Sequence, residues 1–360
     1  MIISIISVFL LFSLVILTHE FGHFWVAKKV GIKVEKFSLG FGPKIFSWKR
    51  GETIYQISLI PFGGFVKMAG EEYEEKKEFE KWEYIGKPPG ERAKVLISGS
   101  IHNFIFGFFL LIPAFMIGIS GFDGTKIGSF VEGLPAETSG LKIGDEIIEV
   151  NNKRCREWFD VMFEIKNSTS KNKEKPIEIK VKRNEELLTF SIKPGIYIFT
   201  DQKGTKEILY LIGISPTLKM EKYKFFPATV RAGKEVYRVV YRTFDGIIKL
   251  IKKEISFQKS FAGPIGIAKW GAEISHQGIG EFLHFLCIIS ISIGFFNFIP
   301  FFGLDGGHLF GVLLEKILKK KPKKKLLEIT QLIGIVCLVC LALYVTYNDF
   351  LRILEERIKK

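Results

Sequence analysis

The sequence contains few cysteines, and they give no disulfide framework. Only four occur in 360 residues: Cys155 is alone in a polar region, and the other three lie in apolar segments. Cys337 and Cys340 form a CxxC, but no second pair accompanies it, so small side chains packed in a helix explain it better than a metal site does. A fold held together by disulfides is therefore excluded.

The first 18 residues contain no charged side chain. A cleaved signal peptide is one interpretation, but the segment lacks the basic start and the small-residue cleavage site of such a leader. A motif with metal-binding spacing also follows it directly. We therefore expect residues 1–30 to form a first transmembrane helix that is retained in the mature protein.

Three further apolar segments follow, at Val95–Ile119, residues 282–317 and Leu326–Tyr347. Each is long enough to cross a hydrocarbon core of ~30 Å, which takes about 20 helical residues. Pro300 and its neighbouring glycines interrupt the third. The sequence thus predicts a polytopic α-helical membrane protein with about four transmembrane helices.

The formal net charge of +14 would also suit a nucleic-acid-binding protein. The lysines, however, gather in short loops next to predicted helix ends, which is typical of cytoplasmic loops. One such loop follows the first helix, and Lys319–Lys325 forms the other. We therefore predict that both loops are cytoplasmic, that Gly121–Gly280 lies across the membrane from them, and that nucleic acid is not a partner.

The pentad His19–His23 reads His-Glu-Phe-Gly-His and continues the first helix. Two histidines four positions apart share one helical face and can bind one metal ion, and Glu20 can then act as a base toward the attacking water. Ionisable groups at membrane depth are costly and indicate function. The motif predicts a zinc peptidase that works inside the membrane.

A catalytic zinc site needs a third protein ligand, and Asp305 is the best candidate. It lies in an apolar segment, beside two glycines that allow close approach. An Asp in a tight turn after Pro300 is the alternative. The expected depth of Asp305 in the bilayer favours its interpretation as a metal ligand. At ~1.5 Å per residue, His19 and Asp305 are both expected near the cytoplasmic edge of the bilayer.

Two regions outside the membrane segments are predicted to contain strands. Thr53–Ile60 alternates and is rich in β-branched and aromatic residues, so it is predicted to be a strand beside the metal motif. An extended substrate can add to its edge by β-augmentation, with Ile57, Ser58 and Leu59 as contacts. From Gly121 the composition changes to that of an α+β domain outside the bilayer, and residues 222–256 are typical of an amphipathic helix.

Two distant motifs, in the right order, carry a resemblance over nearly the whole chain. The sequence resembles the site-2-protease-type zinc metalloproteases of the bacterial regulator-of-sigma-E group, which are intramembrane enzymes with PDZ domains. His19–His23 matches the HExGH motif of that family, and Asn297–Gly307 matches its NxxPxPxLDGG motif. Weaker similarities lie at Phe37–Pro43, Leu59–Met68, Gly133–Asn151 and Gly263–Ile267.

The resemblance implies roles for particular residues. His19, His23 and Asp305 are implied as ligands of Zn²⁺, and Glu20 as the catalytic base. Asn297 is implied as a contact to the substrate backbone or to the developing oxyanion, and Asn103, in the family's second-helix pattern, is a further candidate for this role. The expected substrates are single-span membrane proteins, such as an anti-sigma factor, or signal-peptide remnants. An upstream site-1-type protease would make the first cut outside the inner membrane.

The predicted organisation follows from these assignments. In chain order it comprises a first transmembrane helix with the metal motif (1–30), a cytoplasmic membrane-associated β loop with a charged helix (31–94), a second transmembrane helix (95–120), one extracytoplasmic PDZ-like α+β domain (121–195), a strand and amphipathic helical connector (196–280), a third, interrupted transmembrane segment (281–318), a basic cytoplasmic loop (319–325), a fourth transmembrane helix (326–348) and a short tail (349–360).

Some alternatives stay open at this level. The PDZ-like domain either binds a new carboxy terminus or excludes substrates that have not been trimmed. The chain departs from the family pattern at Ser100 and Phe302, where prolines are usual, and it adds His102. A non-catalytic membrane adaptor is the competing function, but it would leave Glu20 and Asp305 without a role.

Overall fold

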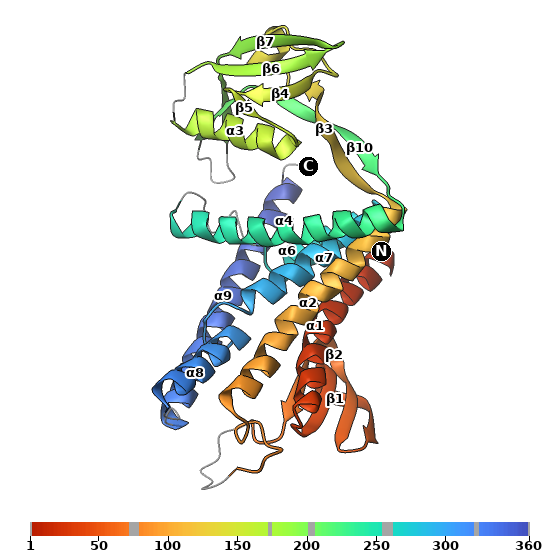
Figure 1. Ribbon diagram of the computed structural model, residues 1–360, viewed down its shortest axis with the longest axis vertical. Coiled ribbons are helices and arrows are strands. Elements are labelled where there is room, and N and C mark those ends of the chain that lie inside the picture. The colour runs from red at the N-terminus through yellow and green to blue at the C-terminus, as the bar shows by residue number, and fades with distance from the viewer. Residues whose placement is uncertain are drawn as a thin grey trace. The chain divides into compact units, whose positions relative to one another are not determined.

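A computed structural model describes residues 2–71, 79–171, 175–200, 206–253, 262–319 and 324–358. The chain forms two compact units. One unit comprises Met1–Gly118 and Lys222–Lys360, and the other comprises Ile119–Glu221 (Figure 1). Part of the charged run between residues 71 and 83, expected to be helical, and most of the lysine loop 319–325 lie outside the described residues.

The first unit is built from long apolar helices. The main ones are α1 (Ile2–Lys29), α2 (Pro89–Ile117), α7 (Ile279–Phe296) and α9 (Lys324–Ile358). Within the described residues, four stretches are long and apolar enough to cross a membrane, one in each of these helices. The expectation of a membrane protein with about four transmembrane helices, accompanied by β-sheet regions, is therefore confirmed.

The third apolar segment is broken in the middle. α7 ends at Phe296, and α8 (Asp305–Leu318) begins only after a turn that contains Pro300. Gly303 in this turn has a φ of +99°, a conformation that glycine adopts without strain. The break matters for the site, because it makes Asp305 the first helical residue of α8 and leaves its side chain free to turn away from α7.

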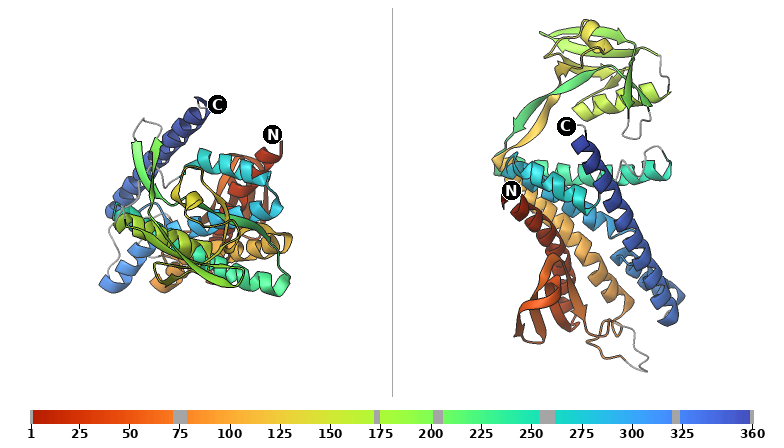
Figure 2. Two further views of the ribbon diagram at one scale, coloured as in Figure 1. Left: turned by 90° about the horizontal axis from the view of Figure 1, so that it is seen from above. Right: turned by 180° about the vertical axis from the view of Figure 1, so that it is seen from behind.

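Two further described helices pack against the long apolar ones. α4 (Phe225–Ile251) runs across α2 and α7 (Figures 1 and 2), and it buries the small side chains Ala228 and Ala232 on the face toward them. α6 (Pro264–Ser275) packs against α1, α7 and α9. Asp349 of α9 accepts hydrogen bonds from the backbone of Gly263 and Gly266 at the start of α6.

β1 (Val34–Arg50) and β2 (Thr53–Met68) fold into a small antiparallel sheet that packs against α1. The first part of β1 is paired on both of its edges, since Phe37 faces Val66 on one side and Tyr55 on the other. It therefore lies between the two halves of β2.

The first half of β2 is also flanked on both sides. Ile57 faces Leu39 on one side and Phe46 on the other. The segments of the sheet thus lie in the order 64–68, 34–39, 53–60 and 44–50. Residues 53–60 are internal, and residues 64–68 form an outer edge.

The second unit, Ile119–Glu221, is an α+β domain. Its sheet has the order β10-β3-β4-β6-β7, with β5 paired to β4, and β8 and β9 form a separate hairpin. Its elements are β3 (Ile119–Phe130), the 3₁₀ helix η1 (Pro135–Thr138), β4 (Glu146–Val150), β5 (Lys153–Arg154), α3 (Trp158–Lys171), β6 (Ile177–Arg183), β7 (Glu186–Ile192), β8 (Gly195–Thr200), β9 (Lys206–Leu211) and β10 (Ile214–Glu221).

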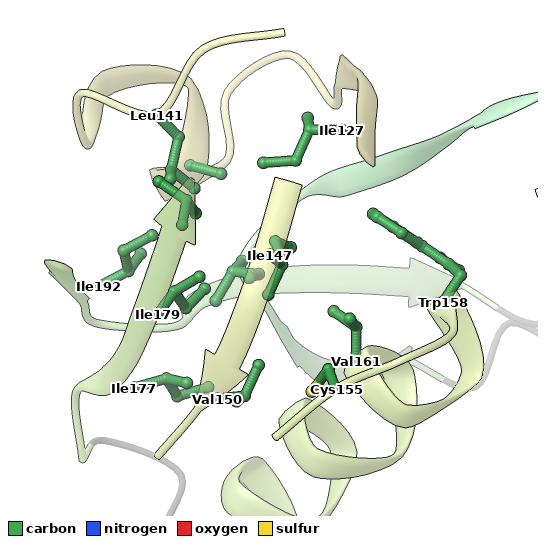
Figure 3. Close-up of a cluster of buried hydrophobic side chains, with 13 residues drawn as sticks. Ile127, Leu141, Ile147, Val150, Cys155, Trp158, Val161, Ile177, Ile179 and Ile192 are labelled. Atoms are coloured by element: carbon green, nitrogen blue, oxygen red, sulfur yellow. The ribbon is translucent and has the colours of Figure 1, made fainter. Parts of the chain in front are cut away.

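The core of this unit lies between the sheet and α3. Ile147 and Ile179 point from neighbouring strands toward Trp158 and Val161 of α3, and all four side chains are buried (Figure 3). The unit extends beyond residue 195, where the sequence placed its end, because β10 pairs with β3. Strand pairing over such a sequence separation leaves no local pattern by which it could be predicted.

Candidate metal centre

α1 brings His19 and His23 together because it is a continuous helix through both residues. Their Nε2 atoms lie 3.2 Å apart, and both residues are buried. A step of four residues is slightly more than one helical turn, so both rings project from the same face of α1.

Asp305 joins the two histidines from a segment almost 300 residues away in the sequence. Its Oδ2 atom lies 2.9 Å from Nε2 of His19 and 3.0 Å from Nε2 of His23. Among the described residues, this is the one group of three histidine, cysteine or acidic side chains whose ligand atoms converge, all within 4.8 Å of one another.

The geometry of the three atoms fits a zinc ion. Two ligand atoms held ~2.0–2.1 Å from one tetrahedral zinc ion lie about 3.3 Å apart, which is close to the three separations found here. Oδ2 of Asp305 is buried and accepts no hydrogen bond from the described residues. Two imidazoles and one carboxylate also form a common catalytic zinc set, in which one position stays open.

α2 contributes no ligand but fixes the orientation of both rings. Nδ1 of His23 lies 2.8 Å from the carbonyl oxygen of Val95, and the ring of His19 hydrogen-bonds the backbone of Gly99. When Nδ1 of His23 donates its proton to this carbonyl, Nε2 is left with the lone pair that a metal requires. Gly99 is necessary for the fit, because a Cβ atom there would lie 2.4 Å from Nε2 of His23.

Glu20 lies next to the convergent atoms and against the sheet. The backbone N–H of Val66 donates to its carboxylate. A cavity of about 1040 Å³ adjoins the centre, and Glu20, Val66 and the ligand side chains line it. The carboxylate therefore faces the space in which a peptide bond and an attacking water would meet.

The structure separates the two asparagines that the sequence assigned to substrate contact. Asn297 ends α7 and lines the cavity, where its amide Nδ2 donates to the carbonyl of Ile293 at 3.1 Å. Asn103 is fully buried, is absent from the cavity wall and lies behind His19, with 3.5 Å between its Nδ2 and Nδ1 of the ring. The ring of His19 therefore lies between Asn103 and the cavity in this arrangement, and substrate contact by Asn103 stays an untested prediction.

The structure places the predicted substrate-binding residues Ile57, Ser58 and Leu59 away from the cavity wall. Ile57 is paired on both sides, Ser58 is buried and bonded to Gln56, and neither these two nor Leu59 line the cavity. Ile57 therefore offers no free backbone edge to a substrate, and substrate contact by these three residues stays an untested prediction.

The edge of the sheet that borders the cavity is the outer segment 64–68, on which the N–H groups of Val66 and Met68 donate to Glu20 and Glu71. From the sequence, Leu59–Met68 carried only a weak family similarity, and no edge was identified there. Gly63-Gly64 was the available signal: two glycines beside a strand allow backbone to approach closely, and a Cβ atom on Gly64 would lie 2.6 Å from the carbonyl of Ser38.

Comparisons with known proteins agree with this geometry. The model of peptidase family M50 matches residues 7–341. A protein named as a zinc metalloprotease in Clostridium perfringens is 32% identical over 347 residues, which cover 96% of this chain and 98% of that protein.

Two relatives carry more specific names. The regulator of sigma-W protease RasP of Bacillus subtilis is 26% identical, over 97% of this chain and 99% of its own length. The regulator of sigma-E protease RseP of Escherichia coli is 25% identical, over 95% of this chain and 97% of its own length. The match extends over nearly the whole chain, and with it the resemblance carried by the two motifs is confirmed: the chain belongs to peptidase family M50, the site-2-type intramembrane zinc metalloproteases.

Proposed function

We propose that this protease cleaves the transmembrane segments of single-span membrane proteins, with His19, His23 and Asp305 as its zinc ligands and Glu20 as its base. The observation that carries the proposal is the convergence of three ligand atoms, from α1 and α8, beside the half-buried carboxylate of Glu20, which lines the same cavity. α1 is itself long and apolar enough to span a membrane, so the reaction would take place within the bilayer.

The chemistry follows from the positions of these side chains. Zinc in this site would polarise the scissile carbonyl and acidify the attacking water. Glu20 would accept the proton of that water and pass it to the leaving amine. Asn297, which ends α7 at the cavity, would turn its amide toward the substrate backbone or the developing oxyanion.

A helical substrate must unwind before its carbonyls can be attacked, and the outer edge at residues 64–68 offers a template. The N–H of Val66 points away from β1 toward Glu20, and the alternation of the strand directs the N–H of Gly64 to the same outer side. The N–H of Met68, also on that side, donates to Glu71 at 3.1 Å, so substrate would have to replace that bond to pair there. An extended peptide that adds here by β-augmentation would present its backbone to the metal centre.

The names of RasP and RseP refer to regulators of sigma factors. By extension, the substrates proposed for this chain are membrane-bound regulators of the anti-sigma type, or remnants of signal peptides. The basic loops favour an inner-membrane orientation with the metal centre near the cytoplasmic side. The unit Ile119–Glu221 would then be an extracytoplasmic, PDZ-like filter that admits substrates after a first cut by an upstream protease.

The test is cleavage of a panel of single-span reporters by the purified chain in detergent, with bound zinc counted. Wild type should cut within the span. Glu20→Gln should keep zinc and lose activity, and Asp305→Asn should lose or weaken zinc binding. Cleavage by Glu20→Gln at the wild-type rate would contradict the proposal and favour a non-catalytic adaptor.

A further inference from the structure

Arg92 and Glu315 form a buried ion pair between α2 and α8. The Nη2 atom of Arg92 lies 2.6 Å from Oε1 of Glu315, and the two side chains are only 7% and 11% exposed. Nε of Arg92 also donates to the carbonyl of Lys87 at 3.1 Å, which holds the guanidinium in place. Both residues line the same cavity as the metal centre, yet neither takes part in the chemistry proposed above.

The ion pair lies on the face of α2 that also orients the histidines. Arg92, Val95, Gly99 and Asn103 follow one another at steps of three or four residues, so they share one side of the helix. Val95 and Gly99 contact His23 and His19 through their carbonyl groups, and Arg92 contacts Glu315. One face of α2 therefore reaches all three ligand-bearing positions: the two histidines directly, and the helix that carries Asp305 through Arg92.

α8 needs such an anchor because few of its residues are buried against the rest of the protein. Its first turn packs closely at Gly306, where a Cβ atom would lie 2.2 Å from the carbonyl oxygen of Ile299. Beyond that turn, Val312 is the one other buried residue described in the helix. The far side is exposed and apolar, as at Leu313 and Ile317.

The spacing along α8 connects the ion pair to the ligand. Asp305, His308, Val312 and Glu315 lie at steps of three or four residues and line the cavity along one face of the helix. Ten residues separate Asp305 from Glu315, so the ion pair acts ~15 Å from the ligand along a rigid helix. A rotation or slip of α8 would move Asp305 away from the histidines, and the bond to Arg92 opposes both movements.

A buried ion pair contributes little net stability, because removing two charges from water offsets most of their attraction. Unlike an apolar contact, however, this hydrogen-bonded ion pair is directional. We propose that Arg92 and Glu315 are positioning residues, which fix the rotation and height of α8 and thereby place Asp305 for zinc binding. This inference rests on the ligand assignment proposed above.

The test measures the zinc dissociation constant of the full chain in detergent by competition with a chelator of known affinity. Glu315→Gln and Arg92→Gln should each weaken zinc binding by about 10- to 100-fold, the range found when groups that hold metal ligands are removed. Raising free zinc should restore cleavage by these variants, whereas Glu20→Gln should stay inactive at any zinc concentration.

Glu235→Gln is the matched control. The carboxylate of Glu235 is as buried as that of Glu315, at 8% exposed, and forms an ion pair of the same 2.6 Å length with Arg238, but within α4 and away from the cavity. This variant should lower the thermal midpoint without changing zinc affinity, which separates positioning from a general loss of stability.

Glu315→Asp keeps the charge and shortens the side chain by one methylene, so it provides a second test if Glu315→Gln does not fold. It should bind zinc more weakly than wild type while its circular dichroism is unchanged. Wild-type affinity in either folded variant would overturn the inference. Loss of zinc by Asp305→Asn in the same assay would show that the ligand assignment still holds, and a wild-type chain that binds no zinc would overturn that assignment instead.

Discussion

Nδ1 of His23 lies 2.8 Å from the carbonyl oxygen of Val95, so α2, which contributes none of the three candidate metal-binding side chains, orients one of them. The carbonyl accepts the ring proton and leaves Nε2 directed at Asp305, 3.0 Å away. The contact requires α1 and α2 to pack closely, and Gly99, one turn further along α2, makes this possible.

Gly99→Ala should therefore abolish zinc binding. The added methyl would lie 2.4 Å from Nε2 of His23 and 2.8 Å from Cε1 of His19, so both rings would have to move. Zinc per chain, measured by atomic absorption after gel filtration, should fall from about one to near zero. Gly246→Ala in α4 is the control, because nothing lies within 4 Å of the added atom there. Equal zinc contents in the two variants would contradict this account of the packing.

Val66→Pro should lower turnover while zinc stays bound. Proline removes the N–H that donates to Glu20 and disrupts the outer edge of the sheet, where we propose that substrate adds. A hydrogen bond to a charged group is worth about 1.5–3 kcal/mol, so kcat/KM should fall by roughly 10- to 150-fold.

Val66→Ala serves as the comparison for the edge, because it shortens the side chain but keeps the N–H. It should retain most of the activity. If the alanine and proline variants were equally impaired, the side chain rather than the backbone edge would be what the substrate contacts.

The sequence was sufficient to single out the three side chains that converge and could hold a metal ion, because each part of the pattern is local. The spacing of His19 and His23 is set by one helical turn, and the depth of Asp305 follows from the length of the apolar segment that precedes it. The four membrane-spanning stretches could be predicted for the same reason, since they are continuous runs of apolar residues.

The parts that could not be predicted depend on pairing between distant segments. The alternation of Thr53–Ile60 indicated a strand, but not that residues 34–39 and 44–50 would cover both of its edges. Likewise, the position of Asn103 in an apolar segment did not reveal whether it faces the cavity or the back of His19. Both questions are decided by tertiary packing, which a single helix or strand does not encode.

The two asparagines should give opposite kinetic results. Asn103→Ala should weaken zinc binding by about tenfold or more, because the residue lies against the ring of His19. Its KM at saturating zinc should be unchanged. Asn297→Ala should leave zinc affinity unchanged and impair kcat/KM, because its side chain lines the cavity. Zinc competition and steady-state cleavage, measured on the same preparations, check both expectations, and a zinc defect in Asn297→Ala would reverse the assignment.

The ion pair between Asp145 and Arg183 should make the stability of the unit Ile119–Glu221 depend on pH. Oδ1 and Oδ2 of Asp145 each accept a bond from the guanidinium at 2.7 Å, and the backbone N–H of Lys142 donates to Oδ2 at 2.8 Å. Burial by itself raises the pKa of this carboxyl, but these hydrogen bonds outweigh it, so the pKa lies below its ordinary value of 3.8.

A carboxyl whose pKa is lowered by folding stabilises the folded state above its unfolded pKa of about 3.9, and this contribution is lost as the pH falls through the folded value. Asp145→Asn should therefore increase opening of the unit near pH 7, and the difference from wild type should shrink below about pH 4. Amide hydrogen exchange of residues 119–221 in the full chain, corrected for the intrinsic pH dependence of exchange, measures both quantities. Asp123→Asn is the control, because its ion pair with Lys126 is exposed to solvent and should matter little at any pH. A difference between Asp145→Asn and wild type that stayed constant down to pH 2 would mean that the variant acts through packing and not through the charge of the carboxylate.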